Sequence, residues 1–186
     1  MADNQTYLSL PDQLSELDDG AEYSGSFDIP MMTVGPDTWR FQAPLSWDVT
    51  VTHPENDMLL FTGTIEGRAE TDCSRCLEPF ELDLDGEIEG YVFRVDPGDN
   101  LPEGVEEGEY LVLDERRGVD IAPFLTAALT LAVPLVPLHD DDCAGLCPNC
   151  GANLNEGPCD CSIEPDPDFE VAANPFAALK NYHFEN

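Results

Sequence analysis

The sequence contains few basic residues. Seven Lys and Arg stand against 39 Asp and Glu, which gives a formal net charge of −32. A charge of this size favours solubility and repels free nucleic acid at long range. Two interpretations follow: an acidic surface that simply faces solvent, which we favour, or a surface that binds a basic partner protein.

The sequence also lacks segments typical of export or membrane insertion. Its first ten residues, MADNQTYLSL, have no cationic start, apolar core or small-residue cleavage site, so we expect a cytoplasmic location. Residues 121–138 carry no charge, but three prolines interrupt them and acidic residues flank them. This pattern predicts a core helix and no membrane span.

The number of cysteines excludes complete pairing, because seven cannot all form disulfides within one molecule. Disulfides are also rare in a reducing cytoplasm. Five of the seven lie within nineteen consecutive positions, CAGLCPNCGANLNEGPCDC. Metal binding is therefore the leading interpretation of the cysteines.

One predicted metal site lies in that cluster. Cys147 and Cys150 form a CPxCG knuckle, in which Gly151 can adopt the positive φ that turns backbone amides toward the sulfurs. Cys159 and Cys161 follow and would complete a tetrahedral four-thiolate site with Zn–S bonds of about 2.3 Å. We predict a structural zinc there. Free thiols on a disordered loop and a bound iron are the alternatives.

A second site could form from the remaining candidate ligands. Cys73 and Cys76 form another CxxC pair, and His139 and Cys143 flank a run of three aspartates. The eight residues would suffice for two four-ligand sites. Three alternatives stay open: a redox role for the CxxC, which would need a βαβ context; an ordinary surface or core role for His139; and Cys143 replacing one member of the CxC pair in the first site.

Alternating apolar and polar residues predict β-strands over 39–51, 59–73 and 80–88. Pro44 implies an edge or a bulge in the first of them. The third has one apolar and one wholly acidic face. The CxxC pair lies between the second and third strands, so a hairpin between Glu70 and Phe80 is expected. Shorter strands are predicted at 110–113 and 118–121.

A helix is predicted from about residue 120 to 133, capped by Asp120 and ended by Pro134. Its apolar residues fall on one face: Ile121, Phe124, Leu125, Ala128, Leu129 and Ala132. Asn174-Pro175 predicts a further short helix over 174–180. These elements predict an α+β fold, with a largely antiparallel twisted sheet or partly closed β-barrel, packed by one core helix and followed by a zinc-bound C-terminal lobe.

We expect four regions along the chain. They are an N-terminal arm (1–19), an α+β core domain (20–139), a cysteine-rich zinc-binding lobe (140–161), and an acidic linker with a short C-terminal helix (162–186).

The succession of motifs resembles the YceD family, the large ribosomal RNA subunit accumulation proteins. The resemblance spans roughly residues 20–182 and rests on CSRCLEPF, the apolar helix ending in LAVPLVPLHDDDC, GLCPNCGANLN with CDC, and NPFAALK. It implies a bacterial, non-enzymatic factor needed for normal accumulation of 23S ribosomal RNA, and hence for large-subunit assembly. It places Cys73 and Cys76 in the family's CxRC element and transfers no catalytic residue.

Three functional classes compete. A ribosome-assembly factor would contact 23S ribosomal RNA or an assembly intermediate through a small cationic patch, for which the candidates are Arg40, Arg68, Arg75 and Arg94. An acidic chaperone or docking protein would instead bind a basic ribosomal protein without direct RNA contact. A zinc enzyme is disfavoured, because four cysteine ligands close the coordination shell that a catalytic metal needs open.

Overall fold

The computed structural model describes residues 6–10, 20–55, 58–98, 101–102, 105 and 109–161. Within them the chain forms strands β1 (Tyr7–Ser9), β2 (Ala21–Phe27), β3 (Met31–Val34), β4 (Asp37–Phe41), β5 (Leu45–Glu55), β6 (Met58–Asp72), β7 (Pro79–Phe93), β8 (Tyr110–Val112) and β9 (Gly118–Asp120), and helix α1 (Ala122–Ala132).

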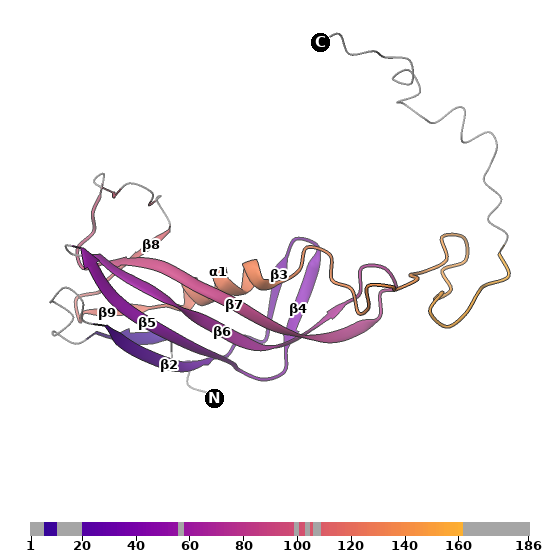
Figure 1. Ribbon diagram of the computed structural model, residues 1–186, viewed down its shortest axis with the longest axis horizontal. Coiled ribbons are helices and arrows are strands. Elements are labelled where there is room, and N and C mark those ends of the chain that lie inside the picture. Colours follow the sequence, from indigo (N-terminus) through magenta and orange to yellow (C-terminus); the bar gives the residue numbers. More distant parts are fainter. Residues whose placement is uncertain are drawn as a thin grey trace, which may run out of the picture.

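The main sheet is built around the long hairpin of β6 and β7, which pair antiparallel from Met58 opposite Phe93 to Asp72 opposite Pro79. The other edge of β6 pairs with β5 and β4, and β2 and β3 lie outside these strands (Figure 1). All pairings are antiparallel except the short one between β7 and β8. The sheet is open, so the predicted antiparallel sheet is confirmed and the barrel alternative is wrong.

The strand predicted over 39–51 is divided in two. β4 ends at Phe41 and β5 begins at Leu45, and Pro44 lies in the bend between them. Because proline has no N–H to donate, a continuous ladder through this position is unfavourable. Both pieces still pair with β6, so Pro44 interrupts the strand without removing it from the sheet.

Helix α1 packs against β7, and its buried residues include Phe124, Leu125, Ala128 and Leu129, as the sequence predicted. It begins at Ala122, two residues later than expected, and its N-cap is Ile121, so the predicted cap at Asp120 is wrong. The carboxylate of Asp120 instead accepts the N–H of Ala122, the first helical residue, at 3.1 Å. A Cβ on Gly90 of β7 would lie 2.5 Å from the Phe124 ring, so this glycine lets the helix approach the strand closely.

The face of β7 away from α1 carries an unbroken series of exposed acids, Glu81, Asp83, Asp85, Glu87 and Glu89, while Leu84 and Ile88 are buried beneath α1. This confirms the predicted division of the strand into an acidic and an apolar face.

Two other expectations concern the ends of the chain. β1 lies within the predicted N-terminal arm and pairs with β9. The acidic linker and the helix predicted over 174–180 lie outside the described residues. Among the helices that the structure describes, none has the length and apolar character to cross a membrane.

Candidate metal centres

The eight predicted metal ligands gather into two groups of four. In each group the ligand atoms all lie within 4.8 Å of one another. The inner cluster consists of Cys73, Cys76, His139 and Cys143, and the outer cluster consists of Cys147, Cys150, Cys159 and Cys161. Cys143 therefore lies with the CxxC of the sheet, and the four-cysteine set is complete without it.

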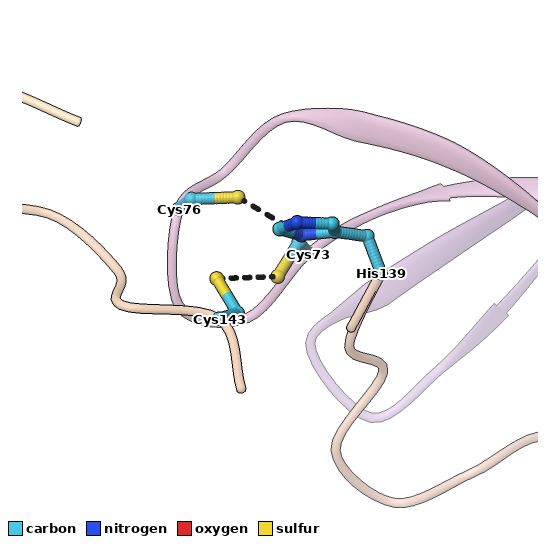
Figure 2. Close-up of side chains that lie close together, drawn as sticks. All are labelled: Cys73, Cys76, His139 and Cys143. Atoms are coloured by element: carbon cyan, nitrogen blue, oxygen red, sulfur yellow. Dashed lines mark hydrogen bonds between the residues drawn. The ribbon is translucent and has the colours of Figure 1, made fainter. Parts of the chain in front are cut away.

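Two distant segments form the inner cluster. Cys73 follows β6 and Cys76 lies in the turn before β7, whereas His139 and Cys143 come from the chain after α1. The Sγ atoms of Cys73 and Cys143 are 3.8 Å apart, and the Sγ of Cys76 is 3.4 Å from His139 Nδ1 (Figure 2). A tetrahedral zinc with Zn–S bonds of about 2.3 Å would separate two sulfurs by about 3.8 Å. The donors thus fit a tetrahedral ion.

Burial distinguishes the members of the inner cluster. The three cysteines are buried, while His139 is exposed. Phe80, Leu138 and Leu146 pack against the cysteines and form a small apolar group separate from the main core. This cluster is therefore largely shielded from solvent, with the histidine at its open side.

Hydrogen bonding and burial give the inner thiols different acidities. Burial alone would raise the pKa of Cys73, but backbone N–H groups of Cys76, His139 and Arg75 stabilise its thiolate and lower the pKa to about 5. For Cys76 the backbone of Glu78 acts to lower the pKa. Burial and the neighbouring thiols Cys73 and Cys143 outweigh it and raise the pKa to about 11.

The turn that holds Cys73 and Cys76 has the hydrogen bonding of a metal knuckle. The N–H of Cys73 donates to the carbonyl of Glu78 at 2.9 Å, and the N–H of Leu77 donates to the carbonyl of Cys73 at 2.8 Å. Leu77 adopts φ of 62° to close this turn. The β6–β7 hairpin thereby turns both sulfurs toward the same side.

The outer cluster contains a knuckle of the same kind. The N–H of Cys147 donates to the carbonyl of Ala152 at 2.8 Å, and the N–H of Gly151 returns to the carbonyl of Cys147 at 2.8 Å. Gly151 has φ of 74°, as the sequence predicted. Leu146 and Asn153 form a β-bridge at the base of the knuckle.

The outer cluster is more open to solvent than the inner one. Cys147 is buried, Cys150 is exposed, and Cys159 and Cys161 are half-buried. Backbone N–H groups of Cys150 and Asn149 lower the pKa of Cys147 to about 6. The Cys150 side chain, with burial and neighbouring charge, raises the pKa of Cys161 to about 12.

Arg75, inside the inner CxxC, binds the segment that runs from Asp141 to Leu146, just before the outer cluster. Its Nη1 donates to the carbonyls of Asp141 at 2.9 Å and Cys143 at 3.0 Å, and its own carbonyl accepts the N–H of Leu146 at 3.2 Å. Gly145 has φ of 73°, and a Cβ there would lie 3.2 Å from that carbonyl. We predicted an RNA-contact role for Arg75 from the sequence. Its bonds to these carbonyls had no signal there beyond the place of Arg75 inside the CxxC.

Asn155 also supports the inner cluster and was not singled out from the sequence. Its Nδ2 lies 3.4 Å from Cys143 Sγ, and its Oδ1 accepts the N–H of Ala144 at 2.8 Å. If Cys143 binds a metal, these contacts would fix the orientation of its side chain.

Comparison with known proteins identifies the family. Residues 61–182 match the family described as Large ribosomal RNA subunit accumulation protein YceD. The chain belongs to the YceD family. A protein with the same description from Haemophilus influenzae is 28% identical over 125 residues, which cover 67% of this chain and 65% of that relative.

Mycobacterial relatives are also similar to this YceD-family chain. Proteins of Mycobacterium tuberculosis and Mycobacterium bovis, both described as uncharacterized, are 32% identical over 101 residues, or 54% of this chain and 47% of each relative. The chain thus spans about half the length of these relatives. No solved structure matches it.

The arginines proposed as RNA contacts in this YceD-family chain have protein partners. Arg40 pairs with Glu70 at 3.5 Å and Asp72 at 3.6 Å. Arg68 pairs with Asp83 at 2.8 Å and with Glu81 at 3.8 Å. Arg94 directly follows β7. RNA contact through any of them stays a prediction.

Proposed function

We propose that this YceD-family chain is a non-enzymatic, cytoplasmic ribosome-biogenesis factor that supports accumulation of 23S ribosomal RNA. It would act on an assembly intermediate of the large subunit. The match over residues 61–182 carries the proposal, together with the description of the Haemophilus influenzae relative.

We further propose that each cluster holds one structural zinc. The support is the donor chemistry: three thiolates and an imidazole in one cluster, four thiolates in the other, each close enough to surround one ion. Bound zinc would supply four strong bonds that link segments with little apolar surface of their own. Four protein ligands leave no open position for a substrate, which argues for a structural role over catalysis.

The two ions would have complementary tasks in this proposal. The inner one would join the β6–β7 turn to the segment after α1, and the outer one would order residues 147–161. The Arg75 side chain already ties the β6–β7 turn to the segment after α1, through the carbonyls of Asp141 and Cys143. The cysteine-rich lobe, which we keep as residues 140–161, would then present one rigid docking surface at the end of the sheet.

Complementation tests the cellular role. In a bacterial strain whose own YceD gene is deleted, the unaltered chain should restore the ratio of 23S to 16S ribosomal RNA. The Cys73→Ser variant should fail to do so, and the exposed-surface variant Ser74→Ala should succeed. If the unaltered chain is produced and stable but leaves the ratio unchanged, the proposed role is wrong.

Elemental analysis tests the metal separately. Freshly purified chain should contain two equivalents of zinc, and Cys147→Ser should lose one of them. Iron in place of zinc would correct the identity of the ion. Absence of both metals would contradict the structural role.

A further inference from the structure

A groove lies between α1 and the outer edge of β7. Its lining includes Gly86, Glu87, Glu89, Phe124, Ala127 and Leu131. It continues past Glu89, Phe124 and Ala127 to Glu109, Leu111 and Pro123. One wall is thus the edge of β7, whose acids point to the sheet face away from α1, and the other is the exposed side of the helix. We call this the β7 groove.

The strand edge in this groove has no strand partner among the described residues. β7 pairs with β6 over its whole length, but on its other side only Tyr91–Phe93 pair, with β8. Residues 79–90 therefore present a row of backbone N–H and C=O groups that can accept another strand in line with β8. An edge of this length accommodates a typical strand.

The two walls specify the chemistry of such a strand. Glu87 and Glu89 are exposed along the edge, and Asp85 precedes them. On the helix side, Leu131 has 85% of its surface exposed, and Ala127 lies one turn before it. Because side chains alternate between the faces of a strand, an added segment would direct basic residues to the acids and apolar residues to the helix.

Charge argues against the other obvious occupants. A nucleic acid strand would bring phosphates to a row of carboxylates on a chain of net charge −32. A second copy paired through the same edge would place two rows of acids beside each other, and like charges in neighbouring strands are destabilising.

We propose that the β7 groove binds an extended, Lys- or Arg-rich segment of a partner protein by strand addition. The inference rests on the proposed function and names the class of partner. That partner is a protein segment in which basic and apolar residues alternate. Main-chain hydrogen bonds to β7 would hold the segment, and the acidic and apolar walls would select its sequence.

Defined peptides provide the test. One labelled probe of about ten residues alternates lysine with valine. A second probe has the same sequence, but two adjacent central amides are N-methylated. Neither edge of this peptide can then form a complete ladder of hydrogen bonds with β7. The full-length, metal-loaded chain should bind the first probe and slow hydrogen exchange at amides in residues 79–90. Losing backbone hydrogen bonds should weaken the second probe on the order of tenfold.

Matched variants locate the binding. Reversing Glu87 and Glu89 to lysine should weaken the first probe on the order of tenfold, because two local attractions become repulsions. Glu22 and Asp48 lie on the same sheet face near the opposite edge, in the same cross-strand rows. Reversing them changes the net charge equally and should alter binding by less than about twofold.

The apolar wall has its own matched pair. Leu131→Ser should weaken the probe several-fold, whereas Leu135→Ser, at a residue 96% exposed and outside the groove lining, should leave binding unchanged. Both leucines are so exposed that neither change should affect folding.

Several outcomes would overturn the proposal. They are no binding of the alternating peptide, equal binding of both peptides, equal effects of the two charge-reversed pairs, tighter binding of single-stranded RNA, or self-association that the Glu87 and Glu89 reversal abolishes. None of these results depends on metal content or on recovery of 23S ribosomal RNA, which are measured in the separate experiments above. Failure of this proposal is therefore distinguishable from failure of the proposed function.

Discussion

The two cysteine clusters share a local design but differ in what surrounds them. Each contains a CxxC knuckle with equivalent backbone hydrogen bonds and a residue of positive φ after the second cysteine. The inner knuckle closes a fifteen-residue strand pair, whereas the outer one lies in a segment with a single β-bridge. A knuckle thus forms from local hydrogen bonds, whereas its contribution to the stability of the fold depends on the elements it joins.

The largest expected difference comes from removing one ligand of each cluster. Cys73→Ser should lower the free energy of unfolding by about 4–5 kcal/mol, because it would remove a buried ligand of the proposed inner zinc site at the end of the sheet. Cys150→Ser, at an exposed position, should cost only about 1–2 kcal/mol. Denaturant unfolding with metal analysis measures both. Equal losses would show that the clusters contribute alike.

Removing the Arg75 side chain, which ties the inner CxxC to the segment that carries Cys143, should have the next largest effect. Arg75→Ala leaves the carbonyls of Asp141 and Cys143 without a donor and should cost about 1–3 kcal/mol. Arg40→Ala, which removes only exposed ion pairs, is the control and should cost about 0–1 kcal/mol. Hydrogen exchange should accelerate in residues 141–146 for the first variant only. Unchanged exchange there would contradict a linking role.

The pH dependence of metal affinity should also separate the clusters. Metal binds thiolates, so protons compete with it and affinity falls as pH falls, by about tenfold per pH unit for each proton displaced. Between pH 7 and 5.5, thiols with a raised pKa stay protonated and each releases a proton when metal binds; these are Cys159 and Cys161 in the outer cluster against Cys76 in the inner one. Over the same range, Cys147, with a pKa of about 6, also takes up more of a proton than Cys73, with a pKa of about 5. Zinc competition titrations should therefore show a steeper decline at the outer cluster. A steeper decline at the inner one would reverse the comparison.

The smallest expected effects come from the positive-φ residues of the knuckles. Leu77→Gly should raise the free energy of unfolding by about 1 kcal/mol, because a left-handed conformation costs a leucine about that much and this side chain is 65% exposed. Gly151→Ala should lower the free energy of unfolding by about 1 kcal/mol, because alanine is strained at the positive φ of this position. Thermal melts of both variants, with metal bound, check the signs. A loss of stability in Leu77→Gly would mean that its side chain makes a contact worth more than the strain.

Local patterns predicted much of this molecule. Two thiols three positions apart lie on one turn whatever the rest of the chain does, and period-2 alternation along β6 and β7 requires one buried face. The buried face of α1 followed from helical spacing in the same way. The alternation over 39–51 did not reveal where β4 would end, since a proline can either bend a strand or interrupt it.

The division of the ligands depended on three-dimensional proximity. Cys143 is four positions from Cys147 but lies beside Cys73, seventy positions away. Spacing alone favours sequence neighbours and left both assignments open. The role of Arg75 was unpredictable for the same reason, because its partners are backbone carbonyls, which carry no sequence signal.

The order of synthesis gives the inner cluster a particular place in folding. Cys73 and Cys76 leave the ribosomal exit tunnel well before His139 and Cys143, so the first two ligands must wait for α1 to be translated. Closure of the cluster therefore follows completion of the β6–β7 hairpin and the arrival of the helix beside it. A metal-filled inner cluster would mark a chain whose sheet and helix have already met.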